Sequence, residues 1–168
     1  MVIMGLDPGS RKAGFAVIKQ TGKKWEYLDS GVLRFDKEPD FLYRLKAIYQ
    51  KCEELKKIYA PDVVALESLI YVKNVTSLAK LAQARGAMIA AFSDERDEER
   101  ETLFEYSPNF VKTSISGHGH ADKAGIEKSL RLIFGEQLPA NKDGDIFSSD
   151  DESDALAIAV CHALQAGS

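Results

Sequence analysis

Four carboxylates stand at the ends of segments that are otherwise apolar, where they could act together in chemistry. Asp7 ends the first apolar run of the chain, and Glu67 ends another one. Asp151 and Asp154 begin an alanine-rich segment with the pattern of a helix, and their three-residue spacing places them on one helical face. A buried charge without a partner is costly, so such positions are rarely occupied by acids for stability alone. These residues are therefore candidates to converge at one site.

A cluster of carboxylates suits a divalent cation that prefers hard oxygen ligands, namely Mg²⁺ or its substitute Mn²⁺. No basic residue within the three segments offers an obvious neutralising partner. Two such ions about 4 Å apart can activate a water molecule on one side of a phosphodiester and stabilise the leaving 3′-oxygen on the other. The sequence thus predicts phosphodiester hydrolysis with two metal ions per active site.

Each acid also has a purely structural interpretation. Asp7 precedes a Pro-Gly pair, and aspartate is common in such turns. Glu67 could form a salt bridge with a lysine, and either Asp151 or Asp154 could serve only as a helix cap. The coincidence of three separate segments favours the catalytic interpretation.

The hydrophobic pattern predicts an α/β domain with a mixed sheet flanked by helices. Apolar runs bounded by turns predict strands at 2–6, 13–19, 25–35, 63–66 and 103–106, the first three of them antiparallel. Four helices are expected: one at 40–59, one that begins at a cap at Thr76 or Ser77 and ends at 92, one that begins at a cap at Asp122 and ends at 134, and one at 149–165. Pro108 should break the fifth strand. If the first and fourth strands are neighbours, Asp7 and Glu67 meet.

Length and composition limit the class of protein. With 168 residues, and about 150 residues per domain as a guide, we expect one domain over residues 1–168. Hydrophobic residues make up 45% and charged residues 29%, which is typical of a globular chain. No apolar run is long enough to span a membrane and no secretory signal pattern is present, so a cytoplasmic location is expected. Cys52 and Cys161 are expected to be buried free thiols.

The net charge of −4 conceals an uneven distribution. Residues 94–101 carry −4 and residues 143–154 carry −6, so the rest of the chain carries +6. A basic face for nucleic acid is therefore compatible with an acidic total.

Ordered motifs along nearly the whole chain resemble the RuvC-type Holliday-junction resolvases. The matching blocks are Gly5–Arg11 (GLDPGSR), Ala65–Glu67 (ALE), Lys73-Asn74, Gln83–Gly86 (QARG), Phe104–Tyr106 (FEY), Val111-Lys112, Gly117–Gly119 (GHG), Lys123 and Asp151–Ala159 (DESDALAIA). The first block alone is weak because sugar-kinase and chaperone ATPases begin similarly, whereas the ordered set is specific.

The resemblance implies a ribonuclease-H-like fold with a mixed five-stranded sheet. It also implies a crossover junction endodeoxyribonuclease that resolves four-way DNA junctions by paired, symmetric, Mg²⁺-dependent nicks in recombination and repair, leaving 5′-phosphates. A homodimer is implied, with a branch-migration complex of the RuvA and RuvB type as a possible partner. By motif match, Asp7, Glu67, Asp151 and Asp154 take the catalytic and metal-binding positions, and Lys112 and Lys123 lie near the scissile phosphate.

Other residues are assigned to DNA with alternatives left open. Where the family often carries a Phe wedge three residues after the strand-end Glu, this chain has Ile70 followed by Tyr71, and either side chain could contact junction bases. Lys73 and Arg85 could contact phosphates or belong to a solvated helix face. The acidic segment 141–150 either screens the DNA side or extends into solvent.

Three other functions compete with junction resolution. The first is a ribonuclease-H-like nuclease for flaps or structured RNA, and the second is a junction-binding module that does not cut. The intact set of four acids argues against the second. An actin-like ATPase needs a second half-domain and a second phosphate loop, for which 168 residues leave no room.

Overall fold

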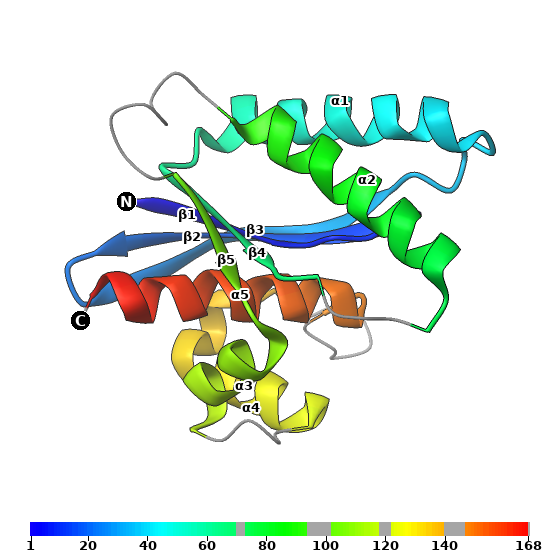
Figure 1. Ribbon diagram of the computed structural model, residues 1–168. Helices are drawn as coiled ribbons and strands as arrows, with labels where there is room; N and C mark the ends of the chain where they lie inside the picture. The colour runs from blue at the N-terminus through cyan, green and yellow to red at the C-terminus, as the bar shows by residue number, and fades with distance from the viewer. Residues whose placement is uncertain (70–72, 94–101, 118–121, 140–146, 168) are drawn as a thin grey trace.

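Five strands form one mixed sheet in the computed structural model, which describes residues 1–69, 73–93, 102–117, 122–139 and 147–167 (Figure 1). The strands are β1 (Val2–Asp7), β2 (Lys12–Thr21), β3 (Lys24–Arg34), β4 (Val63–Glu67) and β5 (Leu103–Tyr106), in the order β3-β2-β1-β4-β5. The pairs β1–β2 and β2–β3 are antiparallel, whereas β1–β4 and β4–β5 are parallel. The mixed five-stranded sheet is thus confirmed, with the first and fourth strands as neighbours.

Helices cover both faces of the sheet (Figure 1). They are α1 (Phe41–Tyr59), α2 (Val75–Phe92), α3 (Pro108–Ser116), α4 (Lys123–Phe134), the short 3₁₀ helix η2 (Gly135–Gln137) and α5 (Asp150–Ala166). One core lies between the sheet and α1 and α2, and the other lies between the sheet and α5, with α3 and α4 packed outside α5. The helix α5 is buried along nearly its whole length, which holds it firmly on the sheet.

The N-cap residues of the helices agree with the sequence prediction at one helix and differ from it at another. Asp40 and Asp122 cap α1 and α4 with their carboxylates, the latter as predicted. The predicted cap at Thr76 or Ser77 is wrong, because the side chain of Asn74 accepts a hydrogen bond from the backbone N–H of Ser77, 2.9 Å away.

The helix α3 was not predicted. Pro108 was interpreted only as the end of a strand, but it occupies the first turn of this helix, where the missing N–H of proline is not needed. Ser107 precedes it as the cap, with its hydroxyl 3.3 Å from the backbone nitrogen of Phe110. This additional helix carries Lys112.

Two glycines allow α5 to approach the sheet closely. A Cβ atom at Gly5 in β1 would lie 2.1 Å from the backbone oxygen of Ala155, and one at Gly14 in β2 would lie 1.7 Å from the backbone oxygen of Asp151. Gly14 is paired with Asp7 across the β1–β2 ladder. The first turn of α5 therefore rests directly against the backbone beside Asp7.

Among the described residues, none of the helices is both long and apolar enough to cross a membrane. Cys52 and Cys161 are buried and form no disulfide, as predicted.

Candidate active site

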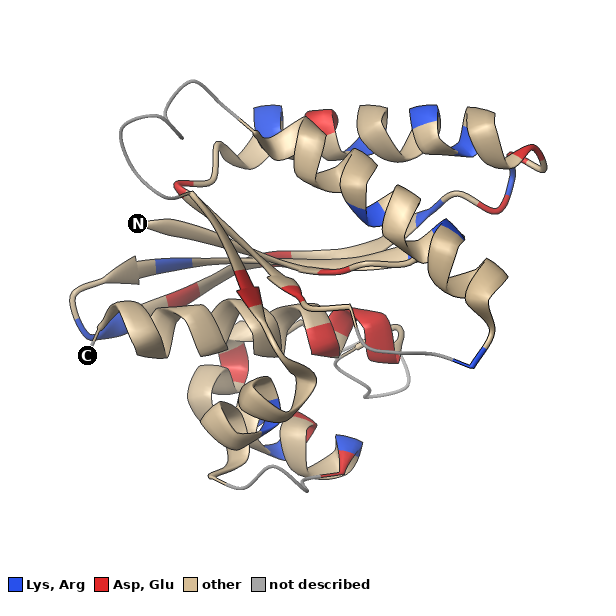
Figure 2. Ribbon diagram, viewed as in Figure 1, with Lys and Arg blue, Asp and Glu red and all other residues tan. Residues whose placement is uncertain are grey.

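The end of β1, the end of β4 and the first turn of α5 bring the four predicted carboxylates to one edge of the sheet. Leu6 pairs with Leu66 in the parallel β1–β4 ladder, so Asp7 and Glu67 follow side by side. Figure 2 shows acidic residues at the start of α5 beside the end of β4. The expected convergence of these segments is what the structure shows.

The pKa of Asp7 reports this proximity. Burial raises the pKa of this carboxyl from 3.8 to about 7, and the negative charges of Asp154, Glu67 and Asp151 add to the effect, in that order. The charge of Lys123 opposes it. A carboxyl surrounded by three other acids favours its neutral form in the absence of additional cations.

Glu67 and Asp154 show the same tendency. Burial is the main cause of the raised pKa of Glu67, with the charge of Asp154 adding and that of Lys112 opposing. Burial also dominates the raised pKa of Asp154, which Lys123 and, to a smaller extent, Lys112 lower. The two lysines thus act against the pKa increase of these acids but do not cancel it.

A pocket of about 230 Å³ lies between these groups. Its charged lining consists of two acids, Glu67 and Asp154, and two lysines, Lys112 and Lys123. Its remaining lining is apolar and comes largely from α3, α4 and α5 (Pro108, Val111, Ile126 and Ala157). Lys112 and Lys123, assigned from the sequence to DNA, are therefore placed beside two of the predicted catalytic acids.

Two lysines from outside the three acid-bearing segments form ion pairs at this edge. Lys12, at the start of β2, pairs with Asp151, and Lys123 pairs with the adjacent Asp150. No local pattern indicates the partner of Lys12, because it lies 139 residues away from Asp151 in the chain. The only available signal was its position just after the turn that follows Asp7.

The donor chemistry of the edge fits a divalent cation, although the side chains do not enclose one. In the described part of the chain, no group of three or more His, Cys, Asp or Glu residues is arranged to hold a metal ion. Burial, together with the charges of three neighbouring carboxylates, nevertheless raises the pKa of Asp7 to about 7, and a perturbed acid of this kind is typical of a functional site. Hard oxygen donors of this kind suit Mg²⁺ or Mn²⁺.

The other predicted DNA-binding residues are placed differently. Arg85 on α2 contacts protein groups, with its guanidinium 2.5 Å from a carboxylate oxygen of Glu105 and 3.4 Å from the backbone oxygen of Glu67. Lys73, between β4 and α2, is exposed. Ile70 and Tyr71 lie outside the described residues, as does most of the acidic segment 141–150.

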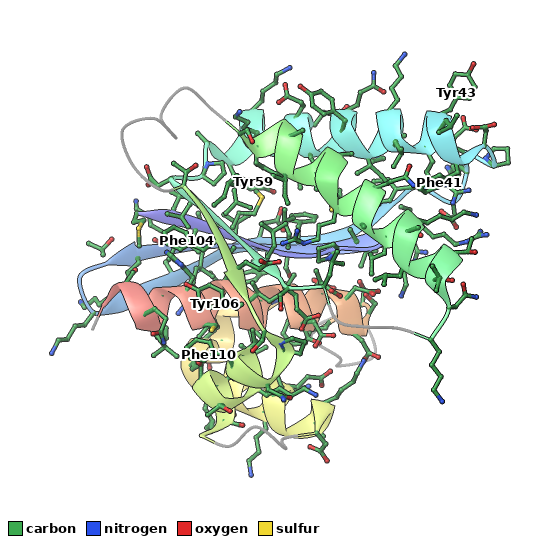
Figure 3. The ribbon with its side chains drawn as sticks, viewed as in Figure 1. Phe41, Tyr43, Tyr59, Phe104, Tyr106 and Phe110 are labelled. Atoms are coloured by element: carbon green, nitrogen blue, oxygen red, sulfur yellow. The ribbon has the colours of Figure 1, made fainter. Side chains whose placement is uncertain are left out.

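Aromatic residues connect β5 with the helices α3 and α5, which line the pocket. The hydroxyl of Tyr106 is 2.8 Å from Nδ1 of His162 on α5, and the rings of Tyr106 and Phe110 stack with centroids 5.8 Å apart (Figure 3). His162 is buried, and burial lowers its pKa. These contacts join β5, α3 and α5, so they help to fix the side of the pocket that carries Lys112.

Asp7→Asn should change how folding stability depends on pH. Because the folded-state pKa of Asp7, about 7, lies above its ordinary value of 3.8, the folded state binds this proton more tightly and wild-type stability falls as pH rises between these values. The shift of about three units corresponds to about 4 kcal/mol, of which we expect about half because partial hydration and relaxation of neighbours screen the charge. In metal-free urea denaturation, the variant should exceed the wild type by about 2 kcal/mol near pH 8 and match it near pH 4.

The exposed residue Asp36 provides the control for this measurement. Asp36→Asn should stay within about 0.5 kcal/mol of the wild type at both pH values. Equal stability of Asp7→Asn and the wild type near pH 8 would contradict a raised pKa of Asp7 in the folded protein.

One protein family matches this chain over nearly its whole length. A family model described as crossover junction endodeoxyribonuclease RuvC matches residues 3–162. Relatives of that name from Thermosipho melanesiensis and Geotalea uraniireducens are 35% and 39% identical, covering 98% and 97% of this chain and 98% and 88% of theirs.

Solved structures agree with the sequence match. Thermus thermophilus RuvC in complex with a Holliday junction substrate has a TM-score of 0.82 at 28% identity, covering 99% of this chain and 95% of that protein. The yeast mitochondrial Holliday junction resolvase Ydc2 shares the fold, with a TM-score of 0.64 at 15% identity over 95% of this chain and 76% of its own.

The mixed sheet and its flanking helices define a protein of the ribonuclease-H-like resolvase class. Both the fold class and the family resemblance noted in the sequence are confirmed. The chain belongs to the RuvC family of crossover junction endodeoxyribonucleases. Proteins of this family are endonucleases that use divalent metal ions.

Proposed function

We propose that this chain resolves four-way DNA junctions by paired, symmetric nicks that leave 5′-phosphate and 3′-hydroxyl ends. The observation that carries the proposal is the electrostatic interaction of Asp7 with three other carboxylates in a chain that matches the RuvC family over residues 3–162. The relative from Thermus thermophilus, solved with a Holliday junction substrate, supports the choice of substrate.

In this proposal Asp7, Glu67, Asp151 and Asp154 bind Mg²⁺, with Mn²⁺ as a substitute and two ions per active site. When bound, the ions would supply the activation of water and the stabilisation of the leaving oxygen. The carboxylates themselves orient the ions. Burial and the neighbouring acids both raise the pKa of Asp7, and bound cations would favour its charged form by offsetting these effects.

The lysines of the pocket would meet the DNA backbone. Lys112 and Lys123 line the same pocket as Glu67 and Asp154, so a phosphate held at the metal-binding acids would lie within reach of both lysines. We assign Lys73 and Arg85 to more distant phosphates and Ile70 or Tyr71 to the junction bases. Arg85 must leave Glu105 to make such a contact.

A homodimer belongs to the proposed function. Two strands of the junction must be cut at related positions, and a two-fold protein matches the two-fold symmetry of its substrate. We also propose a branch-migration complex of the RuvA and RuvB type as the partner that presents the junction.

The test is a cleavage assay with purified protein, a synthetic four-way junction and a linear duplex of the same sequence, with and without Mg²⁺. We expect paired nicks in the junction alone, and only with the metal. Cleavage of both substrates at equal rates would indicate another nuclease specificity. Junction binding with no cleavage under any metal condition would indicate a binding module.

Lys112→Ala should weaken both cleavage and the salt dependence of junction binding. Loss of one phosphate contact lowers the slope of log K against log salt by about 1, and we expect the cleavage rate to fall at least about tenfold. Filter binding over a range of salt concentrations measures the slope.

The matched control is Lys46→Ala, because Lys46 is exposed on α1, on the opposite face of the sheet from the pocket. It should retain the wild-type slope and rate. A normal slope in Lys112→Ala would place that lysine away from the phosphates.

A further inference from the structure

The first turn of α5 carries two of the proposed metal ligands but lacks a side-chain cap of the usual kind. Ser149 occupies the N-cap position, yet its side chain makes no capping hydrogen bond. The first backbone hydrogen bonds, from the nitrogens of Glu152 and Ser153 to the oxygen of Ser149, are long at 3.2 and 3.4 Å. Such a turn frays unless another group holds it.

Besides the ion pair of Asp151 with Lys12, the buried side chain of Glu152 holds this turn. Its side chain is buried, with 6% of the residue exposed, although it lies among acids that are more exposed. One carboxylate oxygen accepts hydrogen bonds from the backbone N–H and the hydroxyl of Ser148, both at 2.8 Å. The other accepts from the hydroxyl of Ser30 at 2.5 Å. Glu152 therefore has three donors, which compensate for the burial of its charge.

These bonds connect the turn to a distant part of the sheet. Ser30 lies in β3, and its hydroxyl is also 2.7 Å from that of Tyr27 in the same strand. Ser148 belongs to the segment that leads into α5. Glu152 thus ties the start of the helix both to the chain preceding it and to β3, while its neighbours Asp151 and Asp154 interact with Asp7.

Helical geometry explains why this matters for the site. Successive residues differ by about 100° around a helix axis, so a side chain fixed at position 152 sets the direction of those at 151 and 154. Gly14 sets how close the turn comes to the sheet, because its missing side chain leaves room for the backbone of Asp151. The hydrogen bonds of Glu152 then set the rotation of the turn.

We propose that Glu152 is a positioning residue of the active site, which orients Asp151 and Asp154 toward Asp7 through Ser30 and Ser148. This inference rests on the proposed function, because it takes Asp151 and Asp154 to be metal ligands. Glu152 itself touches neither metal nor DNA in this role. A residue that only stabilised the fold would not control metal affinity in the folded protein.

Glu152→Gln and Glu152→Ala distinguish a positioning role of Glu152 from a purely stabilising one. Glutamine can accept from both groups of Ser148 through its oxygen and donate to Ser30 through its nitrogen, after which the Ser30 hydroxyl turns to donate to Tyr27. Alanine removes all three bonds. We therefore expect Glu152→Gln to retain Mn²⁺ affinity and kcat within about threefold of the wild type.

For Glu152→Ala we expect Mn²⁺ affinity, measured by calorimetry on the folded protein without DNA, to fall at least about tenfold. The kcat for junction cleavage should fall at least about 30-fold, while KM changes less than about threefold. Glu136→Ala, which removes an exposed acid from η2, is the control and should match the wild type. Wild-type Mn²⁺ affinity in folded Glu152→Ala would overturn the proposal, as would an equal loss in Glu152→Gln.

If Glu152→Ala does not fold, Ser30→Ala and Ser148→Ala decide the question, since each removes only one hydroxyl from the network. Each should lower Mn²⁺ affinity about two- to fivefold, and wild-type affinity in both would overturn the proposal. Failure of the wild type to cut junctions would instead overturn the proposed function, while the metal affinities would still test the positioning role.

Discussion

Asp7→Asn is expected to lower the rate of junction cleavage at least about 10³-fold in saturating Mg²⁺, while junction affinity stays within about threefold. Asp7 is the carboxylate on which the charges of Glu67, Asp151 and Asp154 all act, so it is central to the proposed metal site. Asparagine is nearly isosteric but carries no charge to hold a cation. Single-turnover cleavage and gel-shift binding of the same synthetic junction measure the two quantities.

The loss should not arise from unfolding. Because the substitution removes a buried charge and its repulsion by the other acids, the variant should be at least as stable as the wild type near neutral pH. Asp36→Asn, which changes an exposed acid outside the proposed site, should cut at the wild-type rate. Cleavage by Asp7→Asn at the wild-type rate would remove Asp7 from the site.

Gly14→Ala tests whether the close approach of α5 creates the site. The new Cβ would lie 1.7 Å from the backbone oxygen and 2.3 Å from the backbone carbon of Asp151, so the helix must move away from the sheet. We expect a loss of about 3 kcal/mol in the free energy of unfolding, at the upper end for overpacking, because the clash is with backbone. Displacement of Asp151 and Asp154 should lower cleavage at least about 100-fold.

Urea denaturation and single-turnover cleavage measure these two effects. Gly86→Ala is the matched control, since a Cβ at Gly86 meets nothing within 4 Å and alanine favours the helix that contains it. It should be as stable as the wild type or slightly more so. Normal stability and cleavage in Gly14→Ala would show that the spacing between β2 and α5 is not critical.

The local sequence was sufficient for most of the elements and for the choice of the candidate acids. Among the described residues, alternating and helical apolar patterns predicted all five strands and four of the five α-helices, because these patterns depend only on nearby residues. Asp7 and Glu67 were recognisable as acids ending apolar runs, and the spacing of Asp151 and Asp154 placed them on one face of a helix. The helix α3 was not predicted, because a proline such as Pro108 can either end a strand or begin a helix.

The partners of these acids were decided only by tertiary structure. Lys12 is 139 residues from Asp151 in the chain and Ser30 is 122 residues from Glu152, so no local pattern indicates either contact. The pKa of Asp7 likewise depends on burial and on charges from β4 and α5. The local sequence determined which residues end each element. The packing of α5 on Gly5 and Gly14 determined which of those ends face one another. This could not be predicted locally, because close packing is a property of surfaces that distant segments form together.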